Sequence, residues 1–288
     1  MQKDLFGLIT DRFSQMSKSH KKIATYVTEH GDVAAFITAT KLGKNIGVSE
    51  STVVRFAIEL GFSGYPEFQD ELQRSLRTKL TSVQRIGVAD NMIGEGDVLS
   101  AVLESDMDDI KTTLSEIDNK SFEDAVDTIC SSKKIFIIGV RSSSMLADFL
   151  HHYLCYMFPE VRLMLSNSTD ELFEQIFRMD EKDCLIAISF PRYSSRTKLA
   201  AEFARRKGAK VIAITDSEIS PIAPYANAKL FVKSNMASFV DSLVAPLSII
   251  NALIIALGRK KKDTVKENFD ELEKIWEEYE VYENSGKK

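Results

Sequence analysis

The sequence predicts two architectures in one chain: an all-α N-terminal domain, then an α/β domain in which helices flank a parallel sheet. Through residue 80, apolar residues recur at the spacing of amphipathic helices, with no alternating run typical of a half-buried strand. Beyond residue 130, continuous β-branched runs alternate with helical segments, which indicates a parallel sheet covered on both faces. The length of 288 residues allows more than one compact core.

Composition fits a globular chain in a reducing compartment. The sequence is 44% hydrophobic and 27% charged, which excludes a largely disordered chain. Its three cysteines, Cys130, Cys155 and Cys184, are odd in number and far apart, so they suggest neither a disulfide framework nor a zinc site. The apolar run 243–257 contains Pro246 and is shorter than the ~20 residues of a spanning helix. We therefore expect a cytoplasmic protein without membrane attachment, metal or cofactor.

The charge is unevenly divided along the chain. The net charge of −5 argues against a protein that coats nucleic acid through bulk charge. Through residue 80, however, there are eleven basic and nine acidic side chains, against 26 and 33 in the remainder. The sign of this difference places any polyanionic partner at the N-terminal end.

Residues 40–57 predict a helix-turn-helix within an N-terminal domain of residues 1–77. A short helix, a turn containing Gly47 and a second helix capped by Ser49 follow one another, with Val53 and Val54 in the buried stripe. This spacing leaves the start of the second helix exposed, where such motifs contact base edges and phosphates. A helical hairpin that packs against a partner protein is the alternative. The DNA-binding candidates are Lys44, Ser49, Glu50, Ser51, Thr52 and Arg55.

A polar, glycine-containing segment separates the two architectures. We interpret residues 78–123 as a linker with a connecting helix, residues 124–262 as the α/β domain, and residues 263–288 as a C-terminal helix and tail. Strands are predicted at 134–139, 161–165, 184–189, 210–215 and 229–232. A helix is predicted between the first two strands, ending at about residue 158, and another begins at residue 169. Further helices are predicted at 195–207, 238–258 and 264–282.

Two serine-rich loops follow the first and third predicted strands. Both lie at carboxyl ends of parallel strands and open helices, where unpaired N–H groups attract an anion. Hydroxyl groups and amides together can bind a phosphate without a metal. Alternatively, these serines act only as helix caps and turn residues, and the sequence does not tell which arginines point inward. The ligand-binding candidates are Arg141, Ser142, Ser143, Ser144, Ser189, Arg192, Tyr193, Ser194, Ser195 and Thr197.

The N-terminal domain resembles a known DNA-binding domain. Two runs carry the likeness, Thr52-Val53-Val54-Arg55-Phe56 and Leu60-Gly61-Phe62-Ser63-Gly64-Tyr65-Pro66-Glu67-Phe68. In this order they resemble the hallmark of the MurR/RpiR family of bacterial transcriptional regulators. The resemblance covers residues 1–77 and implies binding to double-stranded operator DNA.

The α/β domain resembles the sugar isomerase (SIS) domain that follows the DNA-binding domain in that family, a flavodoxin-like fold. The run 139–147, the strand 208–215 and the run Ser220-Pro221-Ile222-Ala223 carry the likeness. The resemblance implies a phosphorylated sugar or polyol as effector, with Ser143 as the phosphate-binding serine and Ser189 opening the second loop. Arg141 departs from the family in replacing a glycine, and the longer, more basic loop 190–197 replaces a shorter turn.

These observations favour a regulator that senses a phosphorylated metabolite and binds a palindromic operator as a homo-oligomer, a dimer or a tetramer. The rival is a sugar-phosphate isomerase or lyase, which needs a positioned base. A third possibility is an interaction protein whose helices only dimerise. We expect no catalytic residues, and the candidate bases of the rival hypothesis are His151, His152, Asp170, Glu171 and Glu174.

Overall fold

The structure, a computed structural model, describes residues 5–77, 81, 83–86, 97–165, 168–236 and 238–282. The chain divides into two compact units. The first comprises Met1–Ser105 with Met236–Asp241, and the second comprises Asp106–Asn235 with Ser242–Lys288. Parts of the predicted linker, at 78–80, 82 and 87–96, and the tail at 283–288 lie outside the described residues.

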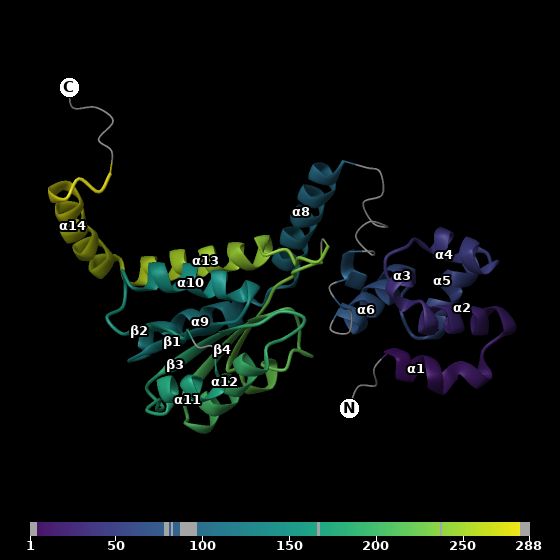
Figure 1. The fold of residues 1–288 in the computed structure, drawn as a ribbon, viewed down its shortest axis with the longest axis horizontal. Coiled ribbons are helices and arrows are strands. Elements are labelled where there is room, and N and C mark those ends of the chain that lie inside the picture. The colour runs from purple at the N-terminus through teal and green to yellow at the C-terminus, as the bar shows by residue number, and fades with distance from the viewer. Residues whose placement is uncertain are drawn as a thin grey trace. The chain divides into compact units, whose positions relative to one another are not determined.

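The first unit is helical, as predicted, and is built around one apolar core (Figure 1). Its centre is formed by Ile23, Leu42, Val53, Phe56 and Phe68, each at most 1% exposed. The rings of Phe56 and Phe68 meet edge to face at 5.6 Å. The elements are α1 (Leu5–Arg12), the 3-10 turn η1 (Phe13–Gln15), α2 (Lys18–Glu29), α3 (Gly31–Ala34), α4 (Ala39–Ile46), α5 (Glu50–Glu59) and α6 (Tyr65–Arg77).

Polar caps determine where these helices begin. The hydroxyl groups of Ser17, Thr38 and Ser49 accept hydrogen bonds from the first-turn N–H groups of α2, α4 and α5. Gly47 follows the last residue of α4 as its C-cap, and its φ of 71° suits a residue without a side chain. The predicted helix, turn and second helix are therefore present between residues 39 and 59.

The second unit contains a five-stranded, fully parallel sheet of order β2-β1-β3-β4-β5. The chain moves outward from β1 in one direction to β2 and in the other through β3, β4 and β5. This order is that of a flavodoxin-like fold, so the predicted fold class is confirmed. The strands are β1 (Ile135–Gly139), β2 (Val161–Leu163), β3 (Cys184–Ile188), β4 (Lys210–Thr215) and β5 (Ala228–Phe231).

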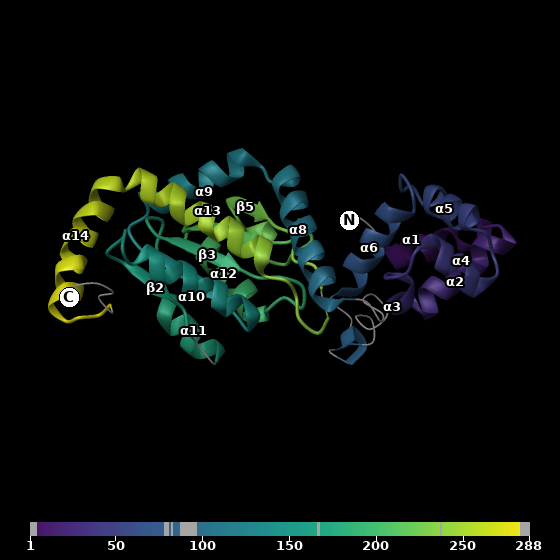
Figure 2. The ribbon, with the colours of Figure 1, turned by 90° about the horizontal axis from the view of Figure 1, so that it is seen from above.

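Helices cover both faces of the sheet because successive strand residues point to opposite sides (Figures 1 and 2). Ile135 and Ile137 of β1 pack with α9, α10 and α13, whereas Phe136 and Ile138 pack with α11 and α12. The remaining elements of the chain are α8 (Val98–Glu116), α9 (Asn119–Ser131), α10 (Ser142–Leu154), α11 (Thr169–Ile176), α12 (Ser195–Arg206), the 3-10 turn η2 (Ala223–Tyr225), α13 (Val244–Lys260) and α14 (Lys262–Glu278).

Two predicted helix ends lie four residues too late, since α10 ends at Leu154 and α14 at Glu278, and one predicted helix start is wrong by six residues. The helix expected over 238–258 begins at Val244, and Met236 and Asp241 instead form an isolated β-bridge. The reason is Pro246, which lacks an N–H group and is tolerated only in the first helical turn. No helix among the described residues has both the length and the apolar character needed to cross a bilayer.

Candidate functional sites

The first candidate site is the exposed surface of the helix-turn-helix. Glu50, Ser51 and Arg55 are exposed and line one shallow hollow on α5 together with Val54. The sequence placed Val54 in the buried stripe, but it is only half-buried and also reaches this outer surface. Its apolar side chain suits a contact with a thymine methyl group.

Several of the predicted DNA-binding side chains have hydrogen-bond partners within the domain. The Thr40 hydroxyl donates to the Glu50 carboxylate at 2.7 Å, so Glu50 braces α4 against α5. Ser49 caps α5, and its hydroxyl lies 2.8 Å from that of Thr52. Arg55 folds back along α5, where its Nε donates to the Ser51 carbonyl oxygen at 3.2 Å. Lys44, in the last turn of α4, is exposed.

The second candidate site lies where β1 and β3 end. These strands are neighbours, and Gly139 pairs with Ile188, so the two serine-rich loops leave the sheet side by side. Successive strands are added to one side of β1 with β2 and to the other side with β3, and open α/β sheets bind ligands at such a switch point. A Cβ atom at Gly139 would lie 2.2 Å from the carbonyl oxygen of Ser143, so only glycine permits this close return of the chain.

The first loop leaves the start of α10 without a side-chain cap. Arg141 occupies the N-cap position with φ 59° and ψ −128°, a backbone conformation that favours glycine, and its side chain is exposed. Ser142 is exposed, Ser143 is 5% exposed, and the Ser144 hydroxyl donates to the Arg141 carbonyl oxygen at 2.6 Å. The Ser144 N–H donates to the same carbonyl oxygen at 2.9 Å, so the N–H groups of Ser142 and Ser143 are the ones that remain available to an anion.

The second loop folds over a buried serine. Ser189 is 3% exposed, and its hydroxyl accepts a hydrogen bond from the Ser194 N–H at 3.4 Å. Ser194 in turn caps α12 by accepting from the Thr197 N–H, so the helix-cap interpretation holds for this residue. Ser195 is exposed, as is Arg192, whose φ is 66°.

Thr197 carries a buried hydroxyl group that is not hydrogen-bonded in the part of the chain that the structure describes. The residue is 0% exposed and lies in the first turn of α12. Burial of a hydroxyl group without a partner is unfavourable and uncommon. Its position at the switch point makes this group a candidate donor to a bound ligand.

Asp216 is a residue of this edge that sequence reasoning missed. The Tyr193 hydroxyl donates to the Asp216 carboxylate at 2.9 Å, so Tyr193 fastens the second loop to the end of β4. The Thr215 hydroxyl donates to the Ser189 carbonyl oxygen at 2.6 Å, which fixes the start of the same loop. The sequence could have indicated Asp216, because Thr215 and Asp216 lie at the carboxyl end of a predicted strand.

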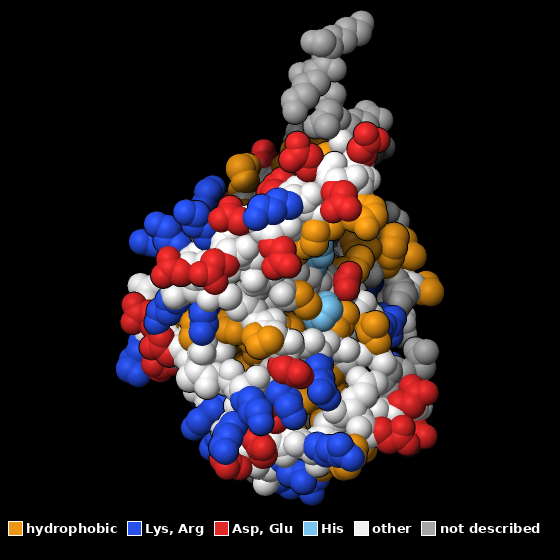
Figure 3. Space-filling view, turned by 90° about the vertical axis from the view of Figure 1, so that its left-hand side faces the viewer, with side chains coloured by type: hydrophobic (Ala, Val, Ile, Leu, Met, Phe, Trp, Pro, Cys, Tyr) orange, Lys and Arg blue, Asp and Glu red, His pale blue; other side chains and the backbone are white. Residues whose placement is uncertain are grey.

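The two candidate histidines of the rival hypothesis lie away from the serine-rich loops. His151 and His152 are in the last turns of α10, about 14 Å along the helix from its start at Ser142. The His152 ring packs edge to face on Tyr156 at 5.2 Å, and histidine side chains visible in Figure 3 lie among hydrophobic ones. Asp170, Glu171 and Glu174 are exposed in the first two turns of α11, which follows β2 at the same edge of the sheet as these loops.

Comparison with known domains divides the chain in the same two parts. Residues 3–79 match the helix-turn-helix domain of the rpiR family, and residues 128–256 match the SIS domain. An HTH-type transcriptional regulator of Haemophilus influenzae is 25% identical over 266 residues, which cover 90% of this chain and 92% of that protein. HexR of Escherichia coli is 26% identical over 271 residues, which cover 90% of each chain.

Solved structures agree on the fold. The NanR protein of Vibrio vulnificus, complexed with ManNAc-6P, superposes with a TM-score of 0.60 at 21% identity and covers 97% of this chain and 100% of its own. The sugar isomerase domain of an RpiR transcription factor from Sphaerobacter thermophilus gives a TM-score of 0.58 at 23% identity, covering 61% of this chain and 97% of its own.

Proposed function

Because the chain belongs to the RpiR family of transcriptional regulators and carries a SIS domain, we propose that a phosphorylated sugar or polyol controls its binding to operator DNA. The NanR protein that shares its fold is complexed with a phosphorylated sugar, ManNAc-6P, which supports this class of effector. The protein acts in the cytoplasm as a dimer or tetramer, since a palindromic operator matches a two-fold symmetric reader.

The observation that carries the effector proposal is the set of unused donors at the switch point. The start of α10 has no side-chain cap, and the Thr197 hydroxyl is buried without a partner among the described residues. Ser143 and Ser189 add two further hydroxyl groups, both at most 5% exposed. A phosphate group, with its several acceptor oxygens, is the chemical complement of such a set.

The proposed phosphate ligands are Ser143, Ser189 and Thr197 together with the N–H groups of Ser142 and Ser143. Arg141 and Arg192 are exposed at the rim, where they attract an anionic ligand. Ser144, Ser194 and Tyr193 have internal partners, so they shape the two loops.

A thermal-shift screen of the full chain against phosphorylated sugars and polyols tests the proposal, with each unphosphorylated counterpart as the control. We expect at least one phosphorylated compound to raise the melting temperature and its counterpart to have no effect. The Ser143→Ala/Ser189→Ala variant removes two donors and should lose most of that shift. A variant that shifts as much as the wild type would refute the site.

DNA binding is proposed to rest on Ser51, Val54 and Arg55 at bases and on Lys44 and the start of α5 at phosphates. For the effector to control it, the effector must bind one conformation of the protein better than another. A difference of about 1–3 kcal/mol changes DNA affinity roughly 5- to 150-fold. Footprinting of genomic fragments with and without the active compound measures this coupling.

We also propose that the protein is not an enzyme. The rival isomerase needs a base at the bound sugar, whereas His151 and His152 lie two turns or more beyond the loops, His152 within an aromatic cluster. The test incubates the purified protein with each compound that shifts its melting temperature and follows product formation. Turnover that is lost in the His152→Ala or Glu174→Ala variant would reverse this conclusion.

A further inference from the structure

Basic side chains are concentrated on two helical segments of the first unit. Residues 12–28 and 33–49 contain no aspartate or glutamate, yet they hold six of the eleven basic side chains present through residue 80. These segments include α4 and all of α2 except its last residue, Glu29, and α4 is the first helix of the helix-turn-helix. The acidic side chains of the domain fall outside them. The weak positive charge of the domain is therefore gathered beside the DNA-reading motif.

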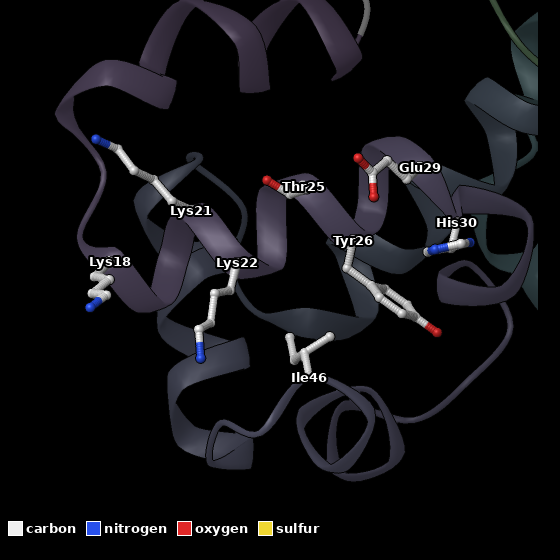
Figure 4. A pocket seen from close by; sticks show the side chains of 8 residues that line it. All are labelled: Lys18, Lys21, Lys22, Thr25, Tyr26, Glu29, His30 and Ile46. Atoms are coloured by element: carbon white, nitrogen blue, oxygen red, sulfur yellow. The ribbon is translucent and has the colours of Figure 1, made fainter.

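A hollow of about 430 Å³ lies along α2 where this charge is densest (Figure 4). Lys18 and Lys22 are one helical turn apart and point to the same side of α2. Glu29 is an acidic lining residue at the far end of the hollow. Six intervening residues, each rising about 1.5 Å, separate Glu29 from the turn of helix that carries the two lysines.

Lys18 and Lys22 differ from their neighbour Lys21. Lys21 also lines the hollow, but its side chain points away from the other two lysines, and its ammonium group lies 5.8 Å from the centre of the Phe13 ring, so it has a partner within the domain. Lys18 and Lys22 are exposed, and neither ammonium group has an ion-pair partner among the residues that the structure describes. Two uncompensated positive charges thus face one hollow.

The same hollow reaches the end of the first reading helix. Ile46, the last residue of α4, lines it beside Tyr26. The side-chain amide of Asn45 donates to the Tyr26 hydroxyl at 3.3 Å, which fixes the last turn of α2 against the end of α4. The lysines are therefore held beside the turn that leads into α5, whose start meets the DNA in a helix-turn-helix.

We propose that Lys18 and Lys22 form an additional contact with the DNA phosphate backbone, on a side of the domain separate from the outer face of α5. This inference rests on the proposed function, since it presupposes that the domain binds DNA. Lysine contacts with phosphate release condensed counterions, so they strengthen binding to any sequence and make it salt-dependent. They position the domain without reading bases.

The test compares the full-length wild type with the Lys18→Gln/Lys22→Gln variant. Fluorescence anisotropy gives the affinity for two duplexes over a series of KCl concentrations: one selected from a random pool by the wild type, and one of unrelated sequence. The slope of log K against log [KCl] is negative, and we expect its magnitude to decrease by about 0.9 for each of the two lysines removed from each bound protomer. The ratio of the two affinities should stay unchanged.

Two controls isolate the contact. Lys182→Gln/Lys198→Gln makes the same change in net charge at exposed positions of the second unit, and Lys21→Gln removes the neighbouring charge. Both should keep the wild-type slope. An unchanged slope in Lys18→Gln/Lys22→Gln, or an equal fall in the controls, would overturn the proposed contact alone. A wild type that selects no duplex would overturn the proposed function itself.

Discussion

Replacing Thr197 by valine should stabilise the free protein and weaken effector binding at the same time. Valine keeps the shape of threonine and removes only the hydroxyl group, which is buried and has no hydrogen-bond partner in the described part of the chain. In the free protein that group costs desolvation energy and makes no hydrogen bond in return. With a phosphate bound, the same group becomes a donor to an anion.

The two effects have opposite signs and measurable sizes. An unsatisfied buried polar group costs about 1–3 kcal/mol, so Thr197→Val should gain about 1 kcal/mol or more, which raises the melting temperature of a domain this size by about 2–4 °C per kcal/mol. Loss of a hydrogen bond to a charged group costs about 1.5–3 kcal/mol, which weakens effector binding roughly ten- to hundredfold. Differential scanning fluorimetry and isothermal titration calorimetry measure the two quantities.

Thr215→Val is the matched control. Thr215 is also 0% exposed, but its hydroxyl donates to the Ser189 carbonyl oxygen at 2.6 Å and lies 2.7 Å from the Ser220 hydroxyl. The same substitution there should destabilise the protein by about 1–3 kcal/mol, because it leaves buried partners unpaired. If Thr197→Val destabilises the protein as Thr215→Val does, or binds the effector as the wild type does, the reasoning is refuted.

Three other substitutions have defined outcomes. Gly139→Ala forces a Cβ atom to within 2.2 Å of the Ser143 carbonyl oxygen, so thermal unfolding should show a loss of about 1–3 kcal/mol and the effector-induced shift should disappear. Arg141→Gly relieves a positive φ of 59°, so it should raise the free energy of unfolding by up to about 1 kcal/mol and thereby raise the melting temperature. A lower melting temperature would show that the arginine side chain stabilises the loop. Arg55→Ala should cost about 1–3 kcal/mol of affinity for a selected duplex in anisotropy measurements, whereas an altered effector-induced shift would contradict its assignment to DNA.

The sheet could be predicted because its strands are buried on both faces. Such strands read as unbroken β-branched runs, and the five predicted strands coincide with the observed ones to within two residues at each end. The edge that holds the candidate site followed from the same reasoning, because carboxyl ends of parallel strands meet at one side. The grouping of Ser143 and Ser189 there needed no further information.

Other features depend on contacts that no local pattern encodes. The hydrogen bond from Tyr193 to Asp216 joins two loops that are 23 residues apart, and neither residue alone indicates the other. Val54 was predicted to be buried because helical spacing shows which residues share the apolar stripe of a helix. The spacing does not show that Val54 lies at the edge of that stripe, where it is only half-buried. The positive φ of Arg141 was signalled only by the glycine that the family has at this position.

The net charge of −5 is compatible with DNA binding because affinity depends on where charges lie. Screening at physiological salt limits the range of electrostatic interactions to about 8 Å. Acidic side chains of the second unit therefore contribute little to the potential at the outer surface of α5, except where they come within that distance. The two acid-free segments, 12–28 and 33–49, supply six cations within the first unit. With only the few phosphate contacts proposed per protomer, one domain would bind DNA modestly, so tight binding would require two domains that act on one operator.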